Sequence, residues 1–443
     1  MTYTPDLLVS YLPRLRGASH CYVGYSGGLD SHVLLVSLVR LLGENAVSAI
    51  HVNHQLSANA ESWEQHCQKV CDGLGVTLSI EQASVIVSGQ GVEEAARTAR
   101  YRAFEKLLPQ DSLLLLGHHA DDQVETVLYR LLRGSGPRGL AGMPASRHLG
   151  NAELLRPLLP FSRSDLEQYA LTEGLVWIED ESNEDVSFDR NFLRHKVIPA
   201  LAERWPDYAT RVAHSARLCR ESDQLSDMLA AQDLIAVYEH RERLGWSISL
   251  EALMSFDELR QANLLRHWAS RHDLAQPGHK IIDAVLHELL PAKADAEPLV
   301  SWAGIQLRRY QRRLFLLPSA PDIPDHLPIS FQWDGRGTLE LPDKSTLSFR
   351  LEQGRGIRLK TDIDTFEVRF RNGSERCKPV GRSASNTLKK LFQEYGLEPW
   401  LRGRIPLLYR DDVLVAVGDL WVCEGFQVPP DEQGCSVQWD FSL

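Results

Sequence analysis

The residues best suited to chemistry form a short loop, Tyr25-Ser26-Gly27-Gly28-Leu29-Asp30-Ser31, between an apolar segment and the apolar run 32–42. A glycine pair between a strand and a helix lets the backbone approach a ligand, and the helix N-terminus offers unpaired N–H groups to an anion. The hydroxyls of Ser26 and Ser31 can add donors, and Asp30 can hold a Mg²⁺ ion that bridges phosphates. The loop has neither the Gly-Lys-Ser/Thr ending of a Walker loop nor the Gly-x-Gly-x-x-Gly dinucleotide pattern. A plain serine-glycine turn with a capping residue is the structural alternative.

A second group of polar residues, His118-His119-Ala120-Asp121-Asp122-Gln123-Val124-Glu125, follows the apolar segment Leu113–Gly117. Asp122 and Glu125 are three residues apart, so on a helix they share one face, and Asp121 with Glu125 is a further possible pair. Carboxylates beside a phosphate site could coordinate a metal, bind an ammonium group or act as a base, although the spacing is not that of a zinc site. Capping of the helix and favourable acids in its first turn are the structural alternative.

Both groups need a scaffold that brings strand ends together. The first 190 or so residues alternate strand-like and helix-like patterns, which is typical of a parallel α/β sheet that binds ligands at the carboxyl ends of its strands. We predict strands at Cys21–Tyr25, Val47–Asn53, Val76–Ile80, Leu113–Gly117 and Leu175–Ile178. Helices are predicted at His32–Leu42, Glu61–Gly73, Val92–Leu107 and Asp121–Leu132.

The rest of the chain divides into two further regions. The segment from about 190 to 313 is helical in pattern and rich in charge. Pro318–Pro328 contains four prolines and predicts a linker, because proline blocks both helix interiors and sheet ladders. Short strand patterns and one helix near Asn386–Tyr395 then predict a small α+β domain. The predicted domains are residues 1–215, a helical substrate-binding domain at 216–320, and 329–443.

Composition sets broad limits on the class of protein. The chain has 443 residues, a net charge of −11 and 43% hydrophobic residues, as expected for a globular protein of two to four domains. No apolar run approaches the ~18 residues of a membrane span, and no secretory signal pattern precedes the first domain. Seven scattered cysteines fit no disulfide framework. We therefore expect a cytoplasmic protein with no membrane partner.

The order Ser-Gly-Gly-x-Asp-Ser resembles the pyrophosphate loop of the N-type ATP pyrophosphatases, which cleave ATP to AMP and pyrophosphate. With the other motifs of the chain, it resembles the long form of the tRNA(Ile)-lysidine synthetases. The motifs that carry this resemblance lie at 26–31, 93–101, 117–126, 133–136, 156–159, 179–183, 189–194 and, near the C-terminus, 381–407. The resemblance is weakest between about 225 and 350, and Gln55-Leu56-Ser57 departs from the family's more usual Gly-Leu-Arg or Gly-Leu-Ser.

The resemblance implies an ATP-dependent ligase that acts on the wobble cytidine of isoleucine tRNA with a CAU anticodon. ATP adenylates the C2 oxygen of the base and releases pyrophosphate, and the ε-amine of free L-lysine then attacks C2 and expels AMP. The product, lysidine, pairs with A instead of G, and charging changes from methionine to isoleucine. ATP and Mg²⁺ are the implied co-substrate and cofactor, and the oligomeric state, monomer or homodimer, stays open.

The resemblance also assigns roles to residues of this chain. ATP is expected to bind Ser26, Gly27, Gly28, Leu29, Asp30 and Ser31, with Asp30 as the Mg²⁺ ligand. His118 is expected to contact the α-phosphate or the leaving AMP. Asp122 and Glu125 suit the lysine ammonium, and one of them could help to deprotonate the amine.

Four arginines are candidates for contacts with phosphate or with the lysine carboxylate, because a guanidinium matches both: Arg97, Arg100, Arg190 and Arg194. We favour Arg194 as the fourth catalytic residue, beside His118, Asp122 and Glu125. A salt bridge from Arg194 to Asp189 or Glu203 is the structural alternative.

A basic segment near the C-terminus suggests where tRNA binds. Residues 355–410 contain 13 Lys/Arg against 6 Asp/Glu, although the whole chain is acidic, and cationic side chains bind phosphates. Its aromatic residues could stack on bases, but most of them are expected to form the core of the small domain. The candidate tRNA-binding residues are Arg133 and Arg138 in a glycine-rich loop, and Arg382, Lys389, Lys390 and Arg402.

Three other functions compete with the lysidine interpretation. A tRNA thiolase with an iron–sulfur cluster would need paired Cys-x-x-Cys motifs, and the closest pair here is Cys67-x-x-x-Cys71, which we expect in a helix and in the core. A synthetase for a small acid would not need residues 325–443. A non-enzymatic RNA-binding module would leave Asp30 without a purpose.

Overall fold

The computed structural model describes residues 3–55, 57, 59–84, 92–293, 296–318, 329–333, 337–360 and 364–441. The chain forms two compact units, residues 1–225 and 226–443, and the boundary lies within the helix α10 (Tyr208–Ala236). The linker predicted at Pro318–Pro328 lies outside the described residues, apart from Pro318. Among the described residues, no helix combines the length and the apolar character needed to cross a membrane.

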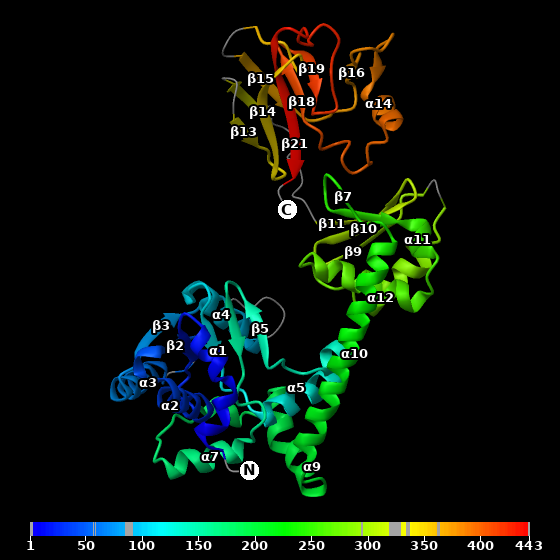
Figure 1. The fold of residues 1–443 in the computed structure, drawn as a ribbon. Coiled ribbons are helices and arrows are strands. Elements are labelled where there is room, and N and C mark those ends of the chain that lie inside the picture. The colour runs from blue at the N-terminus through cyan, green and yellow to red at the C-terminus, as the bar shows by residue number, and fades with distance from the viewer. Residues whose placement is uncertain are drawn as a thin grey trace. The chain divides into compact units, whose positions relative to one another are not determined.

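The first unit is built on a six-stranded sheet with the order β3-β2-β1-β4-β6-β5. All neighbouring strands are parallel except β5, which runs antiparallel to β6. The strands are β1 (Cys21–Gly24), β2 (Val47–Asn53), β3 (Thr77–Gln82), β4 (Leu113–Leu115), β5 (Ser146–Leu149) and β6 (Ala152–Leu155). This topology places the carboxyl ends of the parallel neighbours β1 and β4 side by side. Figure 1 shows the sheet, with β2, β3 and β5 labelled, among the helices of this unit.

Helices cover both faces of this sheet, because its central strands are apolar on both sides. Leu113 and Leu115 of β4 pack in the core with helices α2, α3 and α7, whereas Leu114 packs on the opposite face with Phe104 of α4. Successive side chains of a strand point to opposite faces, so one apolar strand serves two cores. The helices of the unit are α1 (Leu12–Gly17), α2 (Leu29–Leu42), α3 (Ala60–Leu74), α4 (Val92–Leu107), α5 (Ala120–Leu132), α6 (Pro137–Leu140), α7 (Arg163–Thr172), α8 (Asp189–Phe192) and α9 (Ile198–Arg204).

Four of the five predicted strands and all four predicted helices of this region are confirmed, with small differences at their ends. The strand predicted at Leu175–Ile178 is wrong, because this segment is irregular and joins no sheet. Its apolar residues serve another purpose: the backbone N–H of Ile178 donates to the carbonyl of Gly27 (3.0 Å), so the segment packs on the loop. The edge strand β5 and its neighbour β6, which have four residues each, were not predicted.

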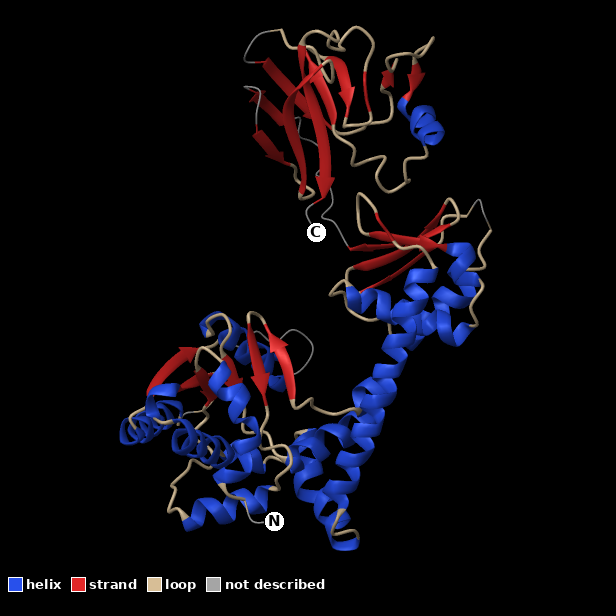
Figure 2. Cartoon of the chain, in the orientation of Figure 1, coloured by secondary structure: helices blue, strands red, loops and turns tan. Residues whose placement is uncertain are grey.

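The second unit begins with helices packed on a five-stranded antiparallel sheet of order β7-β8-β11-β10-β9 (Figure 2). This sheet was not predicted within the helical region. Its main hairpin, β10–β11, turns through Gln311 and Arg312, both with positive φ, and charged residues hide its strand pattern. The elements are β7 (His240–Arg241), β8 (Trp246–Ser249), α11 (Leu250–Met254), α12 (Glu258–Arg271), α13 (His279–Ala284), β9 (Leu299–Trp302), β10 (Ile305–Tyr310) and β11 (Arg313–Pro318).

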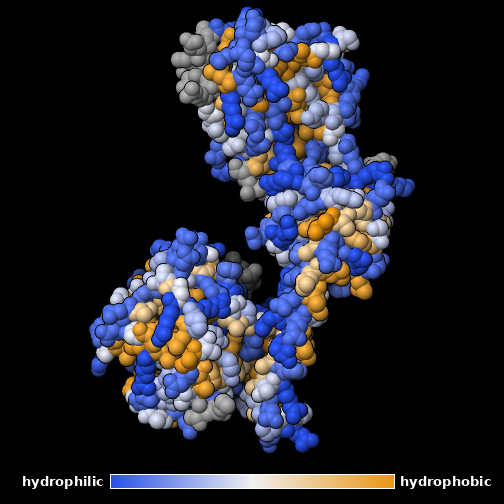
Figure 3. Space-filling model, in the orientation of Figure 1, coloured by the Kyte–Doolittle hydropathy of each residue, from blue (hydrophilic) through white to orange (hydrophobic). Residues whose placement is uncertain are grey.

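The C-terminal part of this unit is a β-rich region with one helix, as the sequence predicts. Its sheets have the orders β12-β15-β18-β19-β20, β13-β14-β21 and β16-β17. The predicted helix near Asn386–Tyr395 is α14 (Leu388–Tyr395). The strands are β12 (Ile329–Trp333), β13 (Gly337–Glu340), β14 (Ser345–Gln353), β15 (Asp364–Arg369), β16 (Arg376–Cys377), β17 (Asn386–Thr387), β18 (Leu407–Arg410), β19 (Val413–Val417), β20 (Trp421–Val422) and β21 (Gln433–Phe441). On the face seen in Figure 3 the surface is mostly hydrophilic, and the hydrophobic residues lie in small groups.

Candidate active site

The loop between β1 and α2 has a backbone that only glycine permits at its centre. Gly27 has φ +84°, and a Cβ atom there would lie 2.6 Å from Cδ1 of Ile178 and 2.9 Å from Sγ of Cys67. Gly28 follows as the N-cap of α2, so the first N–H groups of this helix are at the loop. The loop therefore presents backbone donors at a helix N-terminus, as a phosphate site requires.

The serine hydroxyls, predicted as phosphate donors, hold the loop in shape. The hydroxyl of Ser31 donates to the carbonyl of Gly28 (3.0 Å) and accepts from the N–H of Ser26 (3.2 Å). The hydroxyl of Ser26 in turn accepts from the N–H of Gly28 (3.3 Å). Leu29 is buried in the core, so its side chain anchors the start of α2.

The end of β4 touches the loop directly. A Cβ atom at Gly117 would lie 2.9 Å from the carbonyl oxygen of Asp30 and 3.0 Å from the backbone nitrogen of Ser31. This close approach brings the residues after Gly117 next to the loop. The structure thus places the two sequence groups, 25–31 and 118–125, at one edge of the sheet, as predicted.

A histidine joins the carboxylates of the two groups. Nε2 of His119 lies 3.6 Å from Oδ2 of Asp30 and 3.4 Å from Oδ2 of Asp122, and its Nδ1 lies 3.5 Å from Asp121. Burial alone would lower the pKa of His119, but these three carboxylates raise it to about 9. The ring also caps α5, because its Nδ1 accepts from the backbone N–H of Asp122 (3.4 Å). No function was predicted for His119, and its position next to His118 is the one signal in the sequence.

Asp30 is the acid best placed to hold a metal ion. Burial raises the pKa of its carboxyl group, and Oδ2 lies 3.5 Å from Nη1 of Arg163. Its other oxygen, Oδ1, is buried and has no hydrogen-bond partner among the described residues. An acceptor without a donor, beside a phosphate loop, fits Mg²⁺, which takes one or two carboxylates together with phosphate oxygens and water. Within the described residues no group of three or more His, Cys, Asp or Glu side chains could hold a metal by itself.

Asp122 and Glu125 share a face of α5 as predicted, and both contact Arg194. Nε of Arg194 lies 2.6 Å from Oε1 of Glu125, and Nη2 lies 3.0 Å from Oε2 of Glu125 and 3.4 Å from Oδ1 of Asp122. Burial raises the pKa of Glu125, although Arg194 opposes this shift. Arg194 therefore pairs with the two carboxylates that were predicted to bind lysine. Among the described residues it forms no ion pair with Asp189 or Glu203, which was the structural alternative.

His118 lies at the end of β4 and contacts a buried arginine. Nε of Arg156 donates to Nδ1 of His118 over 3.3 Å. Burial lowers the pKa of His118 to about 3; Asp122 opposes this shift, and Arg156, Arg100 and Arg97 add to it. The imidazole is therefore neutral near pH 7. Arg156 stands in one of the motifs of the resemblance, but no role was predicted for it.

Aromatic rings order several of the predicted arginines. Arg97 lies 5.2 Å from the ring centroid of Tyr101, and Arg190 lies 5.9 Å from that of Tyr129. Burial lowers the pKa of Arg100, whose Nε has no partner among the described residues. These arginines form a cationic cluster close to His118, which suits an anionic substrate.

The predicted tRNA-binding residues fall into two groups, one in each unit. In the first unit, Arg133 lies 5.1 Å from the ring centroid of Tyr129, and Arg138 pairs with Asp223 (3.0 Å). In the second, Lys389 and Lys390 are exposed on α14.

The other two predicted tRNA-binding residues, Arg382 and Arg402, have partners within the second unit. Arg382 pairs with Glu394. Arg402 donates to the carbonyl of Leu397 (2.9 Å) and to the hydroxyl of Tyr310 (3.2 Å).

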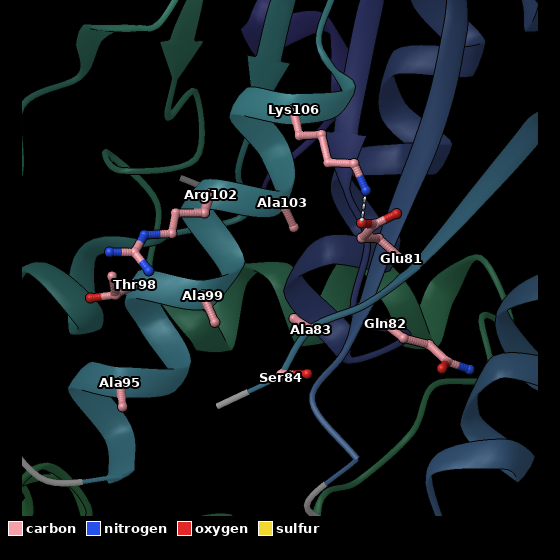
Figure 4. Close-up of a pocket in the computed structure, with 10 residues that line it drawn as sticks. All are labelled: Glu81, Gln82, Ala83, Ser84, Ala95, Thr98, Ala99, Arg102, Ala103 and Lys106. Atoms are coloured by element: carbon pink, nitrogen blue, oxygen red, sulfur yellow. Dashed lines mark hydrogen bonds and ion pairs between the residues drawn. The ribbon is translucent and has the colours of Figure 1, made fainter. Parts of the chain in front are cut away.

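The cavity drawn in Figure 4, of about 490 Å³, lies between α4 and the end of β3. The ion pair between Lys106 and Glu81 (2.6 Å) crosses it. None of the predicted site residues lines this cavity, so it is separate from the candidate active site. The lining residues are Glu81, Gln82, Ala83, Ser84, Ala95, Thr98, Ala99, Arg102, Ala103 and Lys106.

Comparison with known proteins gives matches along most of the chain. A PP-loop domain model matches residues 6–201, a TilS substrate binding domain model matches 248–315, and a TilS substrate C-terminal domain model matches 366–439. The solved structure of U34-tRNA thiolase NcsA from Methanococcus maripaludis with its [4Fe-4S] cluster is 18% identical, with a TM-score of 0.41, and covers 49% of this chain and 78% of that chain.

Curated relatives are similar over the full length. The tRNA(Ile)-lysidine synthase of Coxiella burnetii is 38% identical over 440 residues, which cover 98% of this chain and 96% of the relative. That of Serratia proteamaculans is 40% identical over 439 residues, with 98% of each chain covered. Because this identity extends through all three matched domains, the chain belongs to the tRNA(Ile)-lysidine synthase family.

Proposed function

We propose that this chain joins the ε-amine of L-lysine to C2 of the wobble cytidine in tRNA(Ile) with a CAU anticodon, through an adenylated cytidine. The products are lysidine, AMP and pyrophosphate. The observation that carries the proposal is the close approach of Gly117, after β4, to Asp30 and Ser31 of the loop. It supports a phosphate site in the loop, close to α5 and its residues Asp122 and Glu125. A phosphate site is needed for adenylation, and acidic side chains are needed for an amine nucleophile.

The first half of the reaction uses the loop and Asp30. The N–H groups at the start of α2 stabilise the charge that develops on the leaving pyrophosphate. Asp30, through its unpartnered Oδ1, would hold Mg²⁺, which neutralises phosphate charge when bound. Neutral His118 can donate a hydrogen bond to the α-phosphate or to AMP, because its pKa of about 3 keeps it uncharged.

The second half uses the carboxylates of Glu125 and Asp122. Free lysine arrives with a protonated ε-amine, because its pKa is about 10.4. Its ammonium can replace the guanidinium of Arg194 on Glu125 and Asp122, and Arg194 is then free to bind the lysine carboxylate or a phosphate. One of the two carboxylates takes the proton that the amine must lose before it attacks C2.

The tRNA substrate engages more than the first unit. The exposed Lys389 and Lys390 on α14, within the basic segment 355–410, support a phosphate contact there. The proposed domains are residues 1–215, 216–320 and 329–443, and each of them contains one of the three matched segments. The cysteines are free, and six of the seven are buried, which supports a reducing compartment such as the cytoplasm.

The test is ATP-dependent incorporation of labelled lysine into unmodified CAU-anticodon tRNA(Ile), with pyrophosphate release measured in parallel. Wild-type enzyme should do both, and Asp30→Ala should do neither. Glu125→Gln should keep pyrophosphate release and raise the KM for lysine by about tenfold or more, because one charge-assisted contact is lost. Pyrophosphate release without lysine in the tRNA would support the loop but contradict the lysidine proposal.

A further inference from the structure

Arg156 is a buried cation that the proposed reaction does not use. It follows β6 directly and is only 2% exposed. Its side chain makes three hydrogen bonds inside the first unit: Nε to Nδ1 of His118 (3.3 Å), Nη1 to the carbonyl of Pro144 (2.8 Å) and Nη2 to the hydroxyl of Tyr101 (3.3 Å). Because the guanidinium is rigid and planar, these three acceptors hold it in one orientation.

This arginine decides which nitrogen of His118 carries the proton. A guanidinium has donors and no acceptor, so Nδ1 of His118 must be unprotonated. A neutral imidazole then carries its one proton on Nε2. Among the described residues, Nε2 of His118 has no hydrogen-bond partner, so this N–H is available to a bound molecule.

The electrostatics of the site agree with a neutral ring. Burial disfavours the imidazolium, and the guanidinium of Arg156 at 3.3 Å disfavours it further. The ring of Tyr101 also contacts two further arginines, Arg147 at 4.8 Å and Arg97 at 5.2 Å from its centroid. The hydroxyl of Tyr101 accepts the hydrogen bond from Nη2 of Arg156. Asp122 is the acid that acts on His118, and it opposes the lowering of the pKa without reversing it.

We propose that Arg156 is a positioning residue for adenylation, which holds His118 as the Nε2–H tautomer so that His118 meets the α-phosphate as a hydrogen-bond donor and not as a base. The inference rests on the proposed function, which places His118 beside the α-phosphate. A fixed neutral donor stabilises charge on the phosphate oxygens without any proton transfer. Arg156 thus acts through His118 and need not contact the substrate.

The competing explanation is structural, because Arg156 also holds the carbonyl of Pro144. A double-mutant cycle on the full-length enzyme separates a positioning role of Arg156, which acts through His118, from a purely structural role. The amide nitrogen of Gln matches Nε2 of histidine and that of Asn matches Nδ1, so His118→Gln should retain more adenylation than His118→Asn. Arg156→Met should slow pyrophosphate release by about 10–100-fold in the wild-type background, as for other residues that orient a catalytic group. In the His118→Gln background its effect should be less than about twofold.

Equal effects of Arg156→Met in both backgrounds would overturn the proposal. Arg40→Met is the matched control, because Arg40 also donates to a tyrosine hydroxyl (Tyr169, 2.9 Å) and pairs with an acid, Glu173, but lies at the opposite end of α2 from the loop. It should leave pyrophosphate release within about twofold of wild type.

A spectroscopic measurement tests the tautomer without any turnover. In enzyme labelled with ¹⁵N-histidine, the ring signals of His118 are identified by their loss in His118→Gln. Nδ1 should have a pyridine-type shift and Nε2 a pyrrole-type shift in wild type, and Arg156→Lys, a variant that keeps the charge, should mix the two tautomers. A pyrrole-type Nδ1 in active wild-type enzyme overturns this inference alone. The expected spectrum in an enzyme that forms no lysidine overturns the proposed function and, with it, the positioning role.

Discussion

Arg194 and Glu125 form a two-point ion pair in the candidate site, with Nε 2.6 Å from Oε1 and Nη2 3.0 Å from Oε2. They are 69 residues apart in the sequence, and the Glu125 side chain is 4% exposed. A buried carboxylate needs such a partner, because an unpaired charge in the interior is costly. The ion pair with Arg194 therefore stabilises the buried carboxylate of Glu125.

Removal of this partner should cost stability. We expect Arg194→Ala to lower the free energy of unfolding by about 2 kcal/mol, less than for a fully buried pair because Arg194 is 30% exposed. Unfolding by urea measures this loss of free energy. Arg217→Ala is the matched control, because Arg217 and Glu221 also pair at 2.6 Å but are about half exposed, and it should cost less than about 0.5 kcal/mol. Equal losses would contradict the role of burial.

The loop should tolerate no side chain at Gly27. Gly27→Ala combines a left-handed backbone with a Cβ 2.6 Å from Ile178, and we expect ATP binding to weaken at least about tenfold, with about 1–3 kcal/mol of lost stability. Gly43→Ala has nearly the same φ, +85°, with no atom within 4 Å, so it tests the backbone strain alone. Titration of ATP should show normal affinity in Gly43→Ala, and an equal loss in both variants would refute a specific loop effect.

The lysines of α14 should contribute charge to tRNA binding. The double variant Lys389→Ala, Lys390→Ala should weaken tRNA binding and reduce the slope of log Kd against log salt by about 1 to 2, since each lost phosphate contact removes about 0.9. Binding measured from low to moderate salt gives this slope. Lys344→Ala is the control, because Lys344 is exposed in the same unit and pairs with Glu340 (2.9 Å). An unchanged slope in the double variant would place the tRNA elsewhere.

His51 should make the protein less stable in acid. Its Nδ1 donates to the carbonyl of Tyr25 (3.0 Å), and burial lowers its pKa below the ordinary value of about 6.5. The unfolded chain then binds more protons than the folded one, so stability is full above about pH 6.5 and falls as the pH drops below it.

Unfolding by urea at pH 7.5 and pH 5 measures this loss. His51→Asn keeps a donor at the Nδ1 position but cannot titrate, and it should lose less stability than wild type between these two pH values. His279→Asn changes a histidine whose side chain is 84% exposed, and it should keep the wild-type pH dependence. A variant His51→Asn that loses as much as wild type would contradict the assignment.

Local pattern was enough to predict the loop and its neighbours. An apolar strand, two glycines and an apolar helix set the geometry of 25–31 over short distances, and the three-residue spacing of Asp122 and Glu125 places them on one face of any helix. The β10–β11 hairpin escaped prediction because charged residues such as Arg308 and Arg313 obscure its alternation. The strand predicted at Leu175–Ile178 is wrong because Ile178 of this apolar segment packs on the loop at Gly27 and the segment joins no sheet.

The partners of each charge were decided by the tertiary structure alone. The sequence determined that an acid stands at 125, an arginine at 194 and another at 156, but nothing in their neighbourhood shows that Arg194 meets Glu125 or that Arg156 meets His118. Arg156 meets His118 because the sheet order places β6 beside β4, and Arg194 meets Glu125 because the helical turn 193–197 packs on α5. Because these side chains are largely buried, water does not compete for them, and each charged group pairs with the groups that it can reach.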